Sequence, residues 1–387
     1  MRLSKENWKT LKLKDVCENV KSVDIRRQTG SFNYIDIGSI DSGKKRISAV
    51  QKLDWSEASS RARQIIKKGD TLFSTVRVNL ERIAFVEKEI IDGIASTGFT
   101  VIRPDDKADP GYVFYAVSSQ KFINSVVKLQ KGTAYPAVTD KIVFNVEIHI
   151  PPLEEQKQIA ELFQSIETAI DDVEGQERNL LSLKNNLLKE LFSENKQFGN
   201  HLRANDFETV RFDKIAINIS ERVEPKKTEL TTYVGLEHLD ADNLKIERTG
   251  VPDDVIGTKL KIYKGDIIFG KRRAYLRKVA VSHFDGIASA HSMILRANEK
   301  NVEKDFLPYF MQSDVFMSRA VQISEGSLSP TIKWKTMAQQ EFVLPKKEKQ
   351  MDLTLLFKQF DITSELLKEQ KTNLKNLKQN LLHEIFE

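Results

Sequence analysis

The sequence has 387 residues, of which 40% are hydrophobic and 30% charged, and its net charge is +5. This composition allows two or three globular domains and excludes disordered and membrane-embedded classes, because no apolar run reaches the roughly 18 residues of a membrane span. The first residues lack the apolar segment of a signal peptide, and the single cysteine, Cys17, cannot form an internal disulfide. We therefore expect a cytoplasmic location.

The first 150 residues are predicted to form a mixed α/β domain. Alternating and β-branched segments predict strands at 71–76, 100–102 and 143–150, and a strand or a short strand followed by a turn at 8–16. Apolar residues at helical spacing predict a helix over 112–127. Glycine and proline then mark a loop at 131–137.

A long amphipathic helix is predicted to follow, from residue 151 to residue 192. Pro151 and Pro152 can precede a first helical turn but cannot lie inside the helix. Apolar residues, Leu183 among them, then recur every three or four positions, which gathers them on one face. Such a face needs a partner, and we expect the contact to include Ile159, Leu162, Phe163, Ile166, Val173, Leu180 and Leu187.

The second half of the chain repeats the first. When Pro151 is placed on Pro345, Gln156 falls on Gln350 and Phe192 on Phe386. With small shifts for loop insertions, the segment from 207 also repeats the segment from 8. The second helix is therefore the expected partner of the first, and it would contribute Leu356, Phe360, Leu367, Leu374 and Leu381.

The repeat predicts an α+β fold in which two mixed α/β domains are each followed by a long helix. The short connection between the repeats favours antiparallel helices, packed as a coiled coil with pseudo-two-fold symmetry. The predicted boundaries are 1–150 for the first domain, 151–193 for its helix, 194–206 for a linker, 207–344 for the second domain and 345–387 for its helix.

No arrangement of residues in the sequence indicates catalysis. The segment 38–45 resembles a phosphate-binding loop, but it ends in Lys45 where Ser or Thr would hold magnesium. The six histidines are scattered, and one cysteine excludes a cysteine-rich zinc site. We therefore expect no catalytic residues, no bound metal and no cofactor in this chain.

Basic loops that follow predicted strands instead indicate nucleic-acid binding. They occupy equivalent places in the two repeats, at 73–82 and 269–278, and two further pairs of loops could join them, at 96–99 with 289–292 and at 131–135 with 326–329. Arginine can bind guanine edges with two hydrogen bonds and asparagine can bind adenine, although each residue could equally contact phosphate alone. The candidate DNA-binding residues are Thr75, Arg77, Asn79, Arg82, Thr97, Lys131, Thr133, Tyr135, Lys271, Arg272, Arg273, Tyr275, Arg277, His291 and Ser327.

These segments resemble the specificity subunit of type I restriction–modification enzymes. The resemblance covers essentially the whole chain and is carried by IPPLEEQKQIAELF, by FGKRRAYLRK and by the glycine–proline loop before each helix. The second helix departs from the Pro-Pro-Leu pattern, because Pro345 is followed by Lys346 and Lys347.

The resemblance implies two target-recognition domains that each read one half of a bipartite, asymmetric DNA target, with the helices over 159–191 and 353–386 setting the gap between the halves. It implies two methyltransferase (modification) subunits, which use S-adenosylmethionine, and restriction subunits, which use ATP and magnesium, as partners. The alternative is a helical scaffold whose domains do not touch DNA, which the mild net charge leaves open.

Overall fold

The computed structural model describes residues 5–193 and 196–387. The first four residues of the predicted N-terminal domain and residues 194–195 of the predicted linker lie outside the described residues. The chain forms two compact units: the first comprises the residues up to Val173 together with Glu369–Glu387, and the second comprises Glu174–Lys368. The finer domain boundaries given above stay a prediction. No helix among the described residues is long and apolar enough to span a bilayer.

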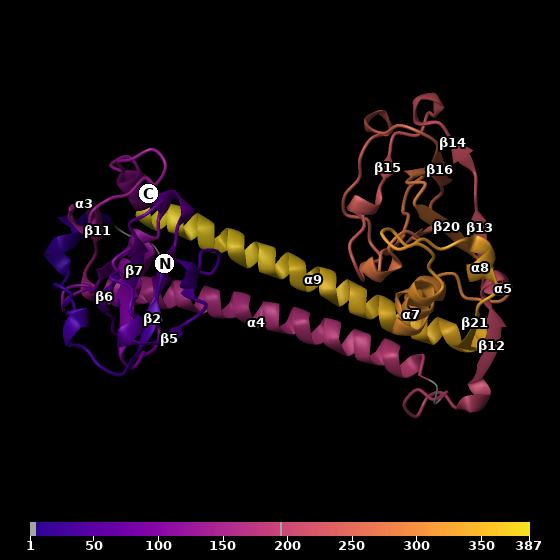
Figure 1. Cartoon of the computed structure of the whole chain (residues 1–387), viewed down its shortest axis with the longest axis horizontal. Helices are drawn as coiled ribbons and strands as arrows, with labels where there is room; N and C mark the ends of the chain where they lie inside the picture. The colour runs from indigo at the N-terminus through magenta and orange to yellow at the C-terminus, as the bar shows by residue number, and fades with distance from the viewer. Residues whose placement is uncertain (1–4, 194–195) are drawn as a thin grey trace. The chain divides into compact units, whose positions relative to one another are not determined.

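In the part of the first unit that the structure describes there are three sheets and, besides 3-10 turns, three short α-helices (Figure 1). A two-stranded antiparallel sheet pairs β1 (Lys9–Lys12) with β11 (Glu147–Ile150). A five-stranded sheet has the order β10-β7-β8-β4-β3, and a four-stranded sheet has the order β5-β2-β9-β6. The bounds of these strands are β2 Ser31–Ile35, β3 Ile40–Asp41, β4 Arg46–Ile47, β5 Gln51–Asp54, β6 Ala62–Ile65, β7 Thr71–Ser74, β8 Ile83–Phe85, β9 Gly93–Ser96 and β10 Phe99–Ile102. The helices are α1 Pro110–Val117, α2 Gln120–Val127 and α3 Asp140–Phe144.

The second unit repeats this plan, with β12 (Phe207–Arg211) paired to β21 (Glu341–Pro345). Its two four-stranded sheets have the orders β13-β20-β17-β18 and β14-β16-β19-β15. The bounds are β13 Ala216–Ile219, β14 Arg222–Val223, β15 Tyr233–Val234, β16 Lys259–Ile262, β17 Ile267–Gly270, β18 Val279–Val281, β19 Gly286–Ala288 and β20 Ser292–Ala297. The helices are α5 Phe212–Ile215, α6 Phe306–Gln312, α7 Asp314–Gln322 and α8 Trp334–Ala338.

An ion pair between an arginine and a buried aspartate occurs at equivalent positions of the two units and confirms the internal repeat. Arg103 donates from Nε and Nη2 to the carboxylate of Asp70 at 2.8 and 2.7 Å. Arg296 binds Asp266 in the same way, at 2.7 and 3.1 Å. Both aspartates are buried, and each has a guanidinium partner that compensates for its loss of water. The predicted fold of two repeated mixed α/β domains is therefore confirmed.

Several predicted elements have different bounds in the structure. The segment 8–16 forms β1 and then a 3-10 helix over Leu13–Val16. The helix predicted over 112–127 is two helices, because the first ends at Ser118 and the Ser119 hydroxyl caps the second by accepting from the Phe122 N–H at 3.3 Å. The strand predicted over 143–150 starts only at Glu147, since the preceding residues form α3.

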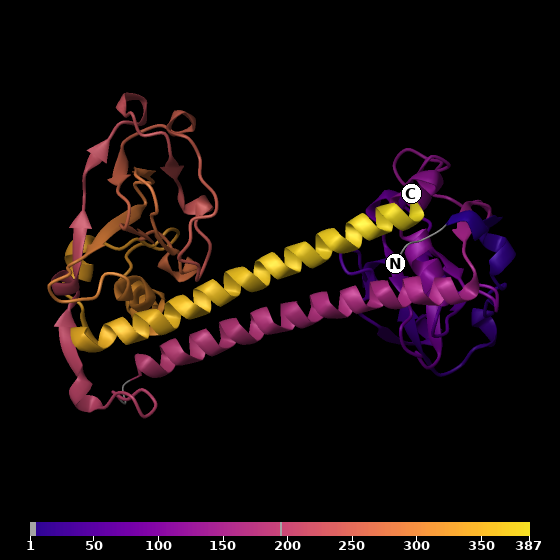
Figure 2. The ribbon, with the colours of Figure 1, turned by 180° about the vertical axis from the view of Figure 1, so that it is seen from behind.

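The long helices are α4 (Leu153–Leu191) and α9 (Lys347–Phe386), and they are packed antiparallel within each unit (Figures 1 and 2). In the first unit the rings of Phe163 and Phe386 lie 6.1 Å apart, and Glu167 pairs with Lys378. In the second unit Lys184 donates to Asp361 at 2.6 Å, and Leu191 shares a core with Leu353 and Phe357. Within each unit the two helices therefore run in opposite directions, as predicted.

The predicted helix contacts differ in burial. Ile159, Phe163, Ile166, Val173 and Leu367 are buried, whereas Leu162, Leu180, Leu187, Phe360, Leu374 and Leu381 are half-buried and Leu356 is partly exposed. Leu183 and its counterpart Leu377, also expected on the apolar face, are 51% and 47% exposed. Near Leu183 the helix buries Lys184 instead, because Asp361 neutralises its ammonium group and its Nζ lies 5.2 Å from the Tyr309 ring centroid.

A buried glutamine attaches each long helix to its own unit. Gln156 accepts from the Asp109 N–H at 2.8 Å and donates to the Pro151 carbonyl at 2.9 Å. Gln350 likewise accepts from the Glu303 N–H at 2.7 Å and donates to the Pro345 carbonyl at 2.8 Å. The glutamine that recurs in the sequence repeat therefore bonds backbone groups both at the start of the long helix and in the neighbouring loop of the globular part.

We expect Gln350→Ala to destabilise the second unit. The substitution leaves a buried N–H and a buried carbonyl without partners, which costs about 1–3 kcal/mol for a polar group of this kind. The free energy of unfolding, measured by denaturant titration of the whole chain, reports the change. Gln359→Ala, at an exposed position of the same helix, is the matched control. Equal stabilities of the two variants would contradict this role of Gln350.

Candidate nucleic-acid interface

One hairpin of each unit holds two non-glycine residues with positive φ angles. Between β7 and β8 the short 3-10 helix Val78–Leu80 is flanked by Arg77 and Glu81, whose φ angles are +49° and +50°. Between β17 and β18 the 3-10 helix Ala274–Leu276 is flanked in the same way by two arginines.

These arginines, Arg273 and Arg277, have φ angles of +57° and +53°. A residue with a Cβ atom loses about 1–2 kcal/mol in this left-handed conformation, so surrounding contacts must impose it. The Arg77 N–H donates to the Pro136 carbonyl at 2.8 Å, and the Arg273 N–H to the Pro330 carbonyl at 2.7 Å. The hairpins are thus joined to the glycine–proline loops, and both arginines are presented in a defined direction.

In the second unit, three of the loops predicted from sequence meet around Arg272. Its guanidinium lies 3.1 Å from Nε2 of His291 through Nη1 and donates to the Ser329 hydroxyl at 3.0 Å through Nη2. Arg273 also donates to this hydroxyl, at 3.3 Å. The structure therefore brings together the hairpin, the 289–292 loop and the 326–329 loop.

The electrostatic environment of these loops is positive. Arginine can only donate, so in its contact with Arg272 the Nε2 of His291 is the acceptor. Desolvation, followed by the charges of Arg272, Lys271 and Lys259, lowers the pKa of His291. Desolvation and the nearby Arg222 lower the pKa of Lys271 in the same direction. An anion bound here would relieve this repulsion.

The first unit gathers the equivalent loops with different side chains. The Arg77 guanidinium lies over the Tyr135 ring at 4.7 Å and donates to the Ala134 carbonyl at 3.4 Å. Thr75 donates to the Gly98 carbonyl from both its N–H and its hydroxyl, each at 2.9 Å. Thr75, one of the candidate DNA-binding residues, is thus buried and holds two loops together.

Two candidate arginines have partners inside the protein. Arg277 donates to Asp242 at 2.7 Å, to Asp314 at 3.0 Å and to the Gln312 carbonyl at 2.6 Å. Arg82 donates to the Ile40 carbonyl at 2.8 Å. The guanidinium groups of Arg277 and Arg82 therefore support the hairpins. The basic residues of the hairpins are thus of two kinds: some have side chains at the loop cluster, and others hold the hairpin in place.

The other candidate residues lie on the same loops. Lys271 is half-buried, and its carbonyl accepts from the Ile332 N–H at 3.0 Å. The remaining candidates are exposed, namely Asn79, Thr97, Lys131, Thr133, Tyr275 and Ser327. From the predicted 326–329 loop, sequence reasoning singled out Ser327 and did not single out Leu328 or Ser329, of which the latter bonds both arginines.

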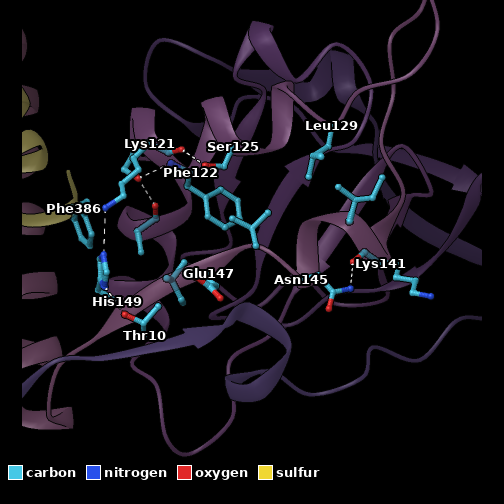
Figure 3. Close-up of a pocket in the computed structure, with 15 residues that line it drawn as sticks. Thr10, Lys121, Phe122, Ser125, Leu129, Lys141, Asn145, Glu147, His149 and Phe386 are labelled. Carbon is cyan, nitrogen blue, oxygen red and sulfur yellow. Dashed lines mark hydrogen bonds between the residues drawn. The ribbon is translucent and has the colours of Figure 1, made fainter.

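A cavity of about 690 Å³ lies elsewhere in the first unit, between α2, α3 and β11 (Figure 3). His149 at its edge lies between Thr10, 3.1 Å from its Nδ1, and Lys121, which donates to its Nε2 at 3.2 Å. Burial and the nearby Lys121 and Lys5 lower the pKa of His149. None of the candidate DNA-binding residues lines this cavity, so it is separate from the loop clusters.

A family model described as the type I restriction modification DNA specificity domain matches residues 5–183 and again 220–376. The chain belongs to this family. The two matches show that both halves of the chain are specificity domains.

Relatives and solved structures agree with this assignment. The chain is 24% identical over 312 residues to the type I restriction enzyme MjaVIII specificity subunit of Methanocaldococcus jannaschii, which covers 75% of this chain and 73% of that protein. It is 22% identical over 299 residues to the EcoDI specificity subunit of Escherichia coli, covering 68% and 67%.

The crystal structure of the HsdS subunit from Thermoanaerobacter tengcongensis has 25% identity and a TM-score of 0.54, over 98% of this chain and 97% of that one. A chain from a structural study of assembly in the type I R-M system shares the fold, with 23% identity and a TM-score of 0.64 over 100% and 99%.

Proposed function

We propose that this chain is the sequence-specific double-stranded DNA-binding subunit of a type I restriction–modification complex. Each unit reads one half of a bipartite, asymmetric target through its loop cluster, and the long helices set the gap between the halves. One observation supports this proposal most directly. Both specificity domains bring the same three loops together around arginines whose backbone is strained and preorganised. Arginine side chains held in this way can donate hydrogen bonds to base edges and to phosphates.

In this proposal the partner subunits catalyse the reactions on DNA. Two methyltransferase subunits supply S-adenosylmethionine-dependent methylation, and restriction subunits supply ATP- and magnesium-dependent cleavage, whereas this chain is non-catalytic and binds none of these cofactors. The complex acts on cellular DNA, so the cytoplasm is the proposed location. The scaffold alternative is not favoured, because it leaves the paired cationic loops of two specificity domains without a role.

Mapping of methylated bases in cells that carry this chain and its modification subunit tests the function. We expect methylation within one asymmetric sequence with a gap of constant length. The assembled complex should also bind random duplex DNA with a steep salt dependence, since each phosphate contact releases counterions. Methylation at sites without any shared sequence would contradict the proposal.

An apolar stripe on α9 is the proposed docking surface for a modification subunit. Met351, Leu355, Ile362 and Leu366 are each more than half exposed, and their spacing places them on one side of the helix. The equivalent positions of α4 in the repeat are polar, namely Lys157, Glu161, Thr168 and Asp172. The fold therefore does not require apolar residues here, and a partner helix could bury them.

We expect the double substitution Leu355→Gln and Ile362→Gln to weaken association with the modification subunit at least tenfold. The loss of two buried aliphatic contacts, each worth about 1.5–3 kcal/mol, accounts for this size. Binding is measured by titration calorimetry with purified subunits. The matched control replaces Glu161 and Thr168 of α4 with alanine. If the two double variants bind alike, the stripe is not the docking surface.

DNA binding is expected to strengthen more for the wild type than for His291→Asn as the pH falls. The pKa of His291 is lowered in the free protein, and phosphate near its imidazole would raise it, so binding takes up a proton. Lowering the pH from about 8 to about 6 passes through the ordinary titration range of histidine. The dissociation constant for target DNA is measured at both values. Identical pH dependence of the two proteins would show that no phosphate approaches His291.

A further inference from the structure

The loop between α7 and α8 carries a large apolar side chain that points away from the protein. Leu328 is 90% exposed, the highest value among the exposed large hydrophobic residues in the described part of the chain. Its neighbours in the loop are glycine, serine and proline, which are ordinary loop residues, so Leu328 is not needed for the turn.

The loop that carries Leu328 is held at both ends. Glu325 and Thr331 exchange two backbone hydrogen bonds, of 3.0 and 2.9 Å, and Gly326 adopts a φ of +106°. At the same time the Ser329 hydroxyl accepts from Arg272 and Arg273. Leu328 is therefore displayed on a closed loop, and little conformational freedom remains to be lost when a ligand covers it.

The charges around Leu328 indicate which ligand would cover it. Arg272 and Arg273 are bonded to the adjacent serine, and the pair Lys333–Glu325 lies at the base of the loop, at 2.6 Å. Arginine beside an apolar side chain also occurs at protein interfaces, so the choice of ligand rests on the positive charge of the whole loop cluster, to which Lys271, Lys259 and Arg222 contribute. This combination matches duplex DNA, in which negative phosphates flank an apolar stack of bases.

We propose that Leu328 is a wedge that enters between two base pairs of the half-site read by the second unit and partly unstacks them. This inference rests on the proposed function and adds local distortion of the DNA to it. Arg272 and Arg273 hold the flanking phosphates or base edges, while Leu328 fills the opened step.

The first unit contacts its half-site in a different way. The equivalent loop presents Tyr135, 70% exposed, with one face of its ring covered by Arg77. The tyrosine is therefore stacked on an arginine of its own unit, and we assign the wedge to the second unit alone. The two half-sites then differ in deformability as well as in sequence.

The test uses the chain assembled with its modification subunit, and target DNA that carries 2-aminopurine at successive positions of each half-site. Fluorescence of this base rises when it is unstacked. We expect a rise at one step of the half-site read by the second unit. Leu328→Ala should abolish the rise and Leu328→Phe should keep it.

Affinity separates the wedge from other roles of Leu328. Because the gain from burying leucine and the cost of unstacking a base step are similar, Leu328→Ala should change the dissociation constant by about threefold or less. Ile91→Ala, an exposed aliphatic position of the first unit, is the control and should change neither signal.

Several outcomes would overturn the inference. They are specific binding by the wild type without any fluorescence rise, a rise that persists in Leu328→Ala, and a Leu328→Ala complex that fails to assemble with the modification subunit. Loss of binding when uracil replaces the thymines of the half-site would instead identify a contact to a thymine methyl group. Failure of the proposed function is distinct, because the wild type would then show no preference for its target DNA at all.

Discussion

Replacing Arg272 and Arg273 with alanine is expected to remove the reading of one half-site and leave the other intact. Each arginine that binds a guanine edge with two hydrogen bonds contributes about 1–3 kcal/mol of discrimination. Both belong to the second unit, whose loops they join through Ser329 and His291. The loss should therefore appear as equal affinity for DNAs that differ only in the half-site read by this unit.

The measurement is a competition assay with DNAs that carry single base-pair changes in either half. The matched control is Lys214→Ala with Lys300→Ala, which removes two positive charges from the same unit. These lysines lie at the far end of the β13–β20 pair from His291. If the arginine variant loses affinity uniformly for all sequences, Arg272 and Arg273 bind phosphates and do not read bases.

Lengthening both α4 and α9 is expected to lengthen the gap in the target that the complex methylates. About seven added residues, two helical turns, extend a helix by about 10 Å and return its apolar face to nearly the same direction. One base pair occupies about 3.4 Å, so the preferred gap should grow by about three base pairs. Mapping of methylated sites in cells gives the new gap directly.

The control for this experiment inserts the residues into α4 alone. An insertion in one helix shifts its contacts against the other, including the ion pair of the buried Lys184 with Asp361, and should destabilise the protein. A doubly extended protein that is stable but keeps the original gap would show that the helices do not set the distance between the half-sites.

The architecture could be predicted because it depends on long, repeated patterns. The periodic apolar residues of α4 and α9, and the recurrence of Gln156 at Gln350, indicate two helices and two related domains without any knowledge of tertiary contacts. Local patterns were less informative. Lys184 is buried and Leu183 is exposed because of Asp361 and Tyr309, which are distant in sequence.

The candidate interface could be predicted only as a set of loops. Arg273 and Arg277 lie in the same basic run, and nothing local distinguishes them. The structure separates their roles, because Asp242 and Asp314 reach Arg277 from other parts of the chain, whereas Arg273 remains at the loop cluster. The exposure of Leu328 also depends on how the closed loop is held, which its composition alone does not reveal.

The pairing of β1 with β11, and of β12 with β21, has a consequence for evolution. In each half of the chain the first strand of the globular part lies beside its last strand, next to the start of the long helix. A gene segment encoding everything between these strands could be exchanged by recombination without moving the ends that join the helices. The lineage could thereby acquire a new DNA target in one step, while the long helices stay the same.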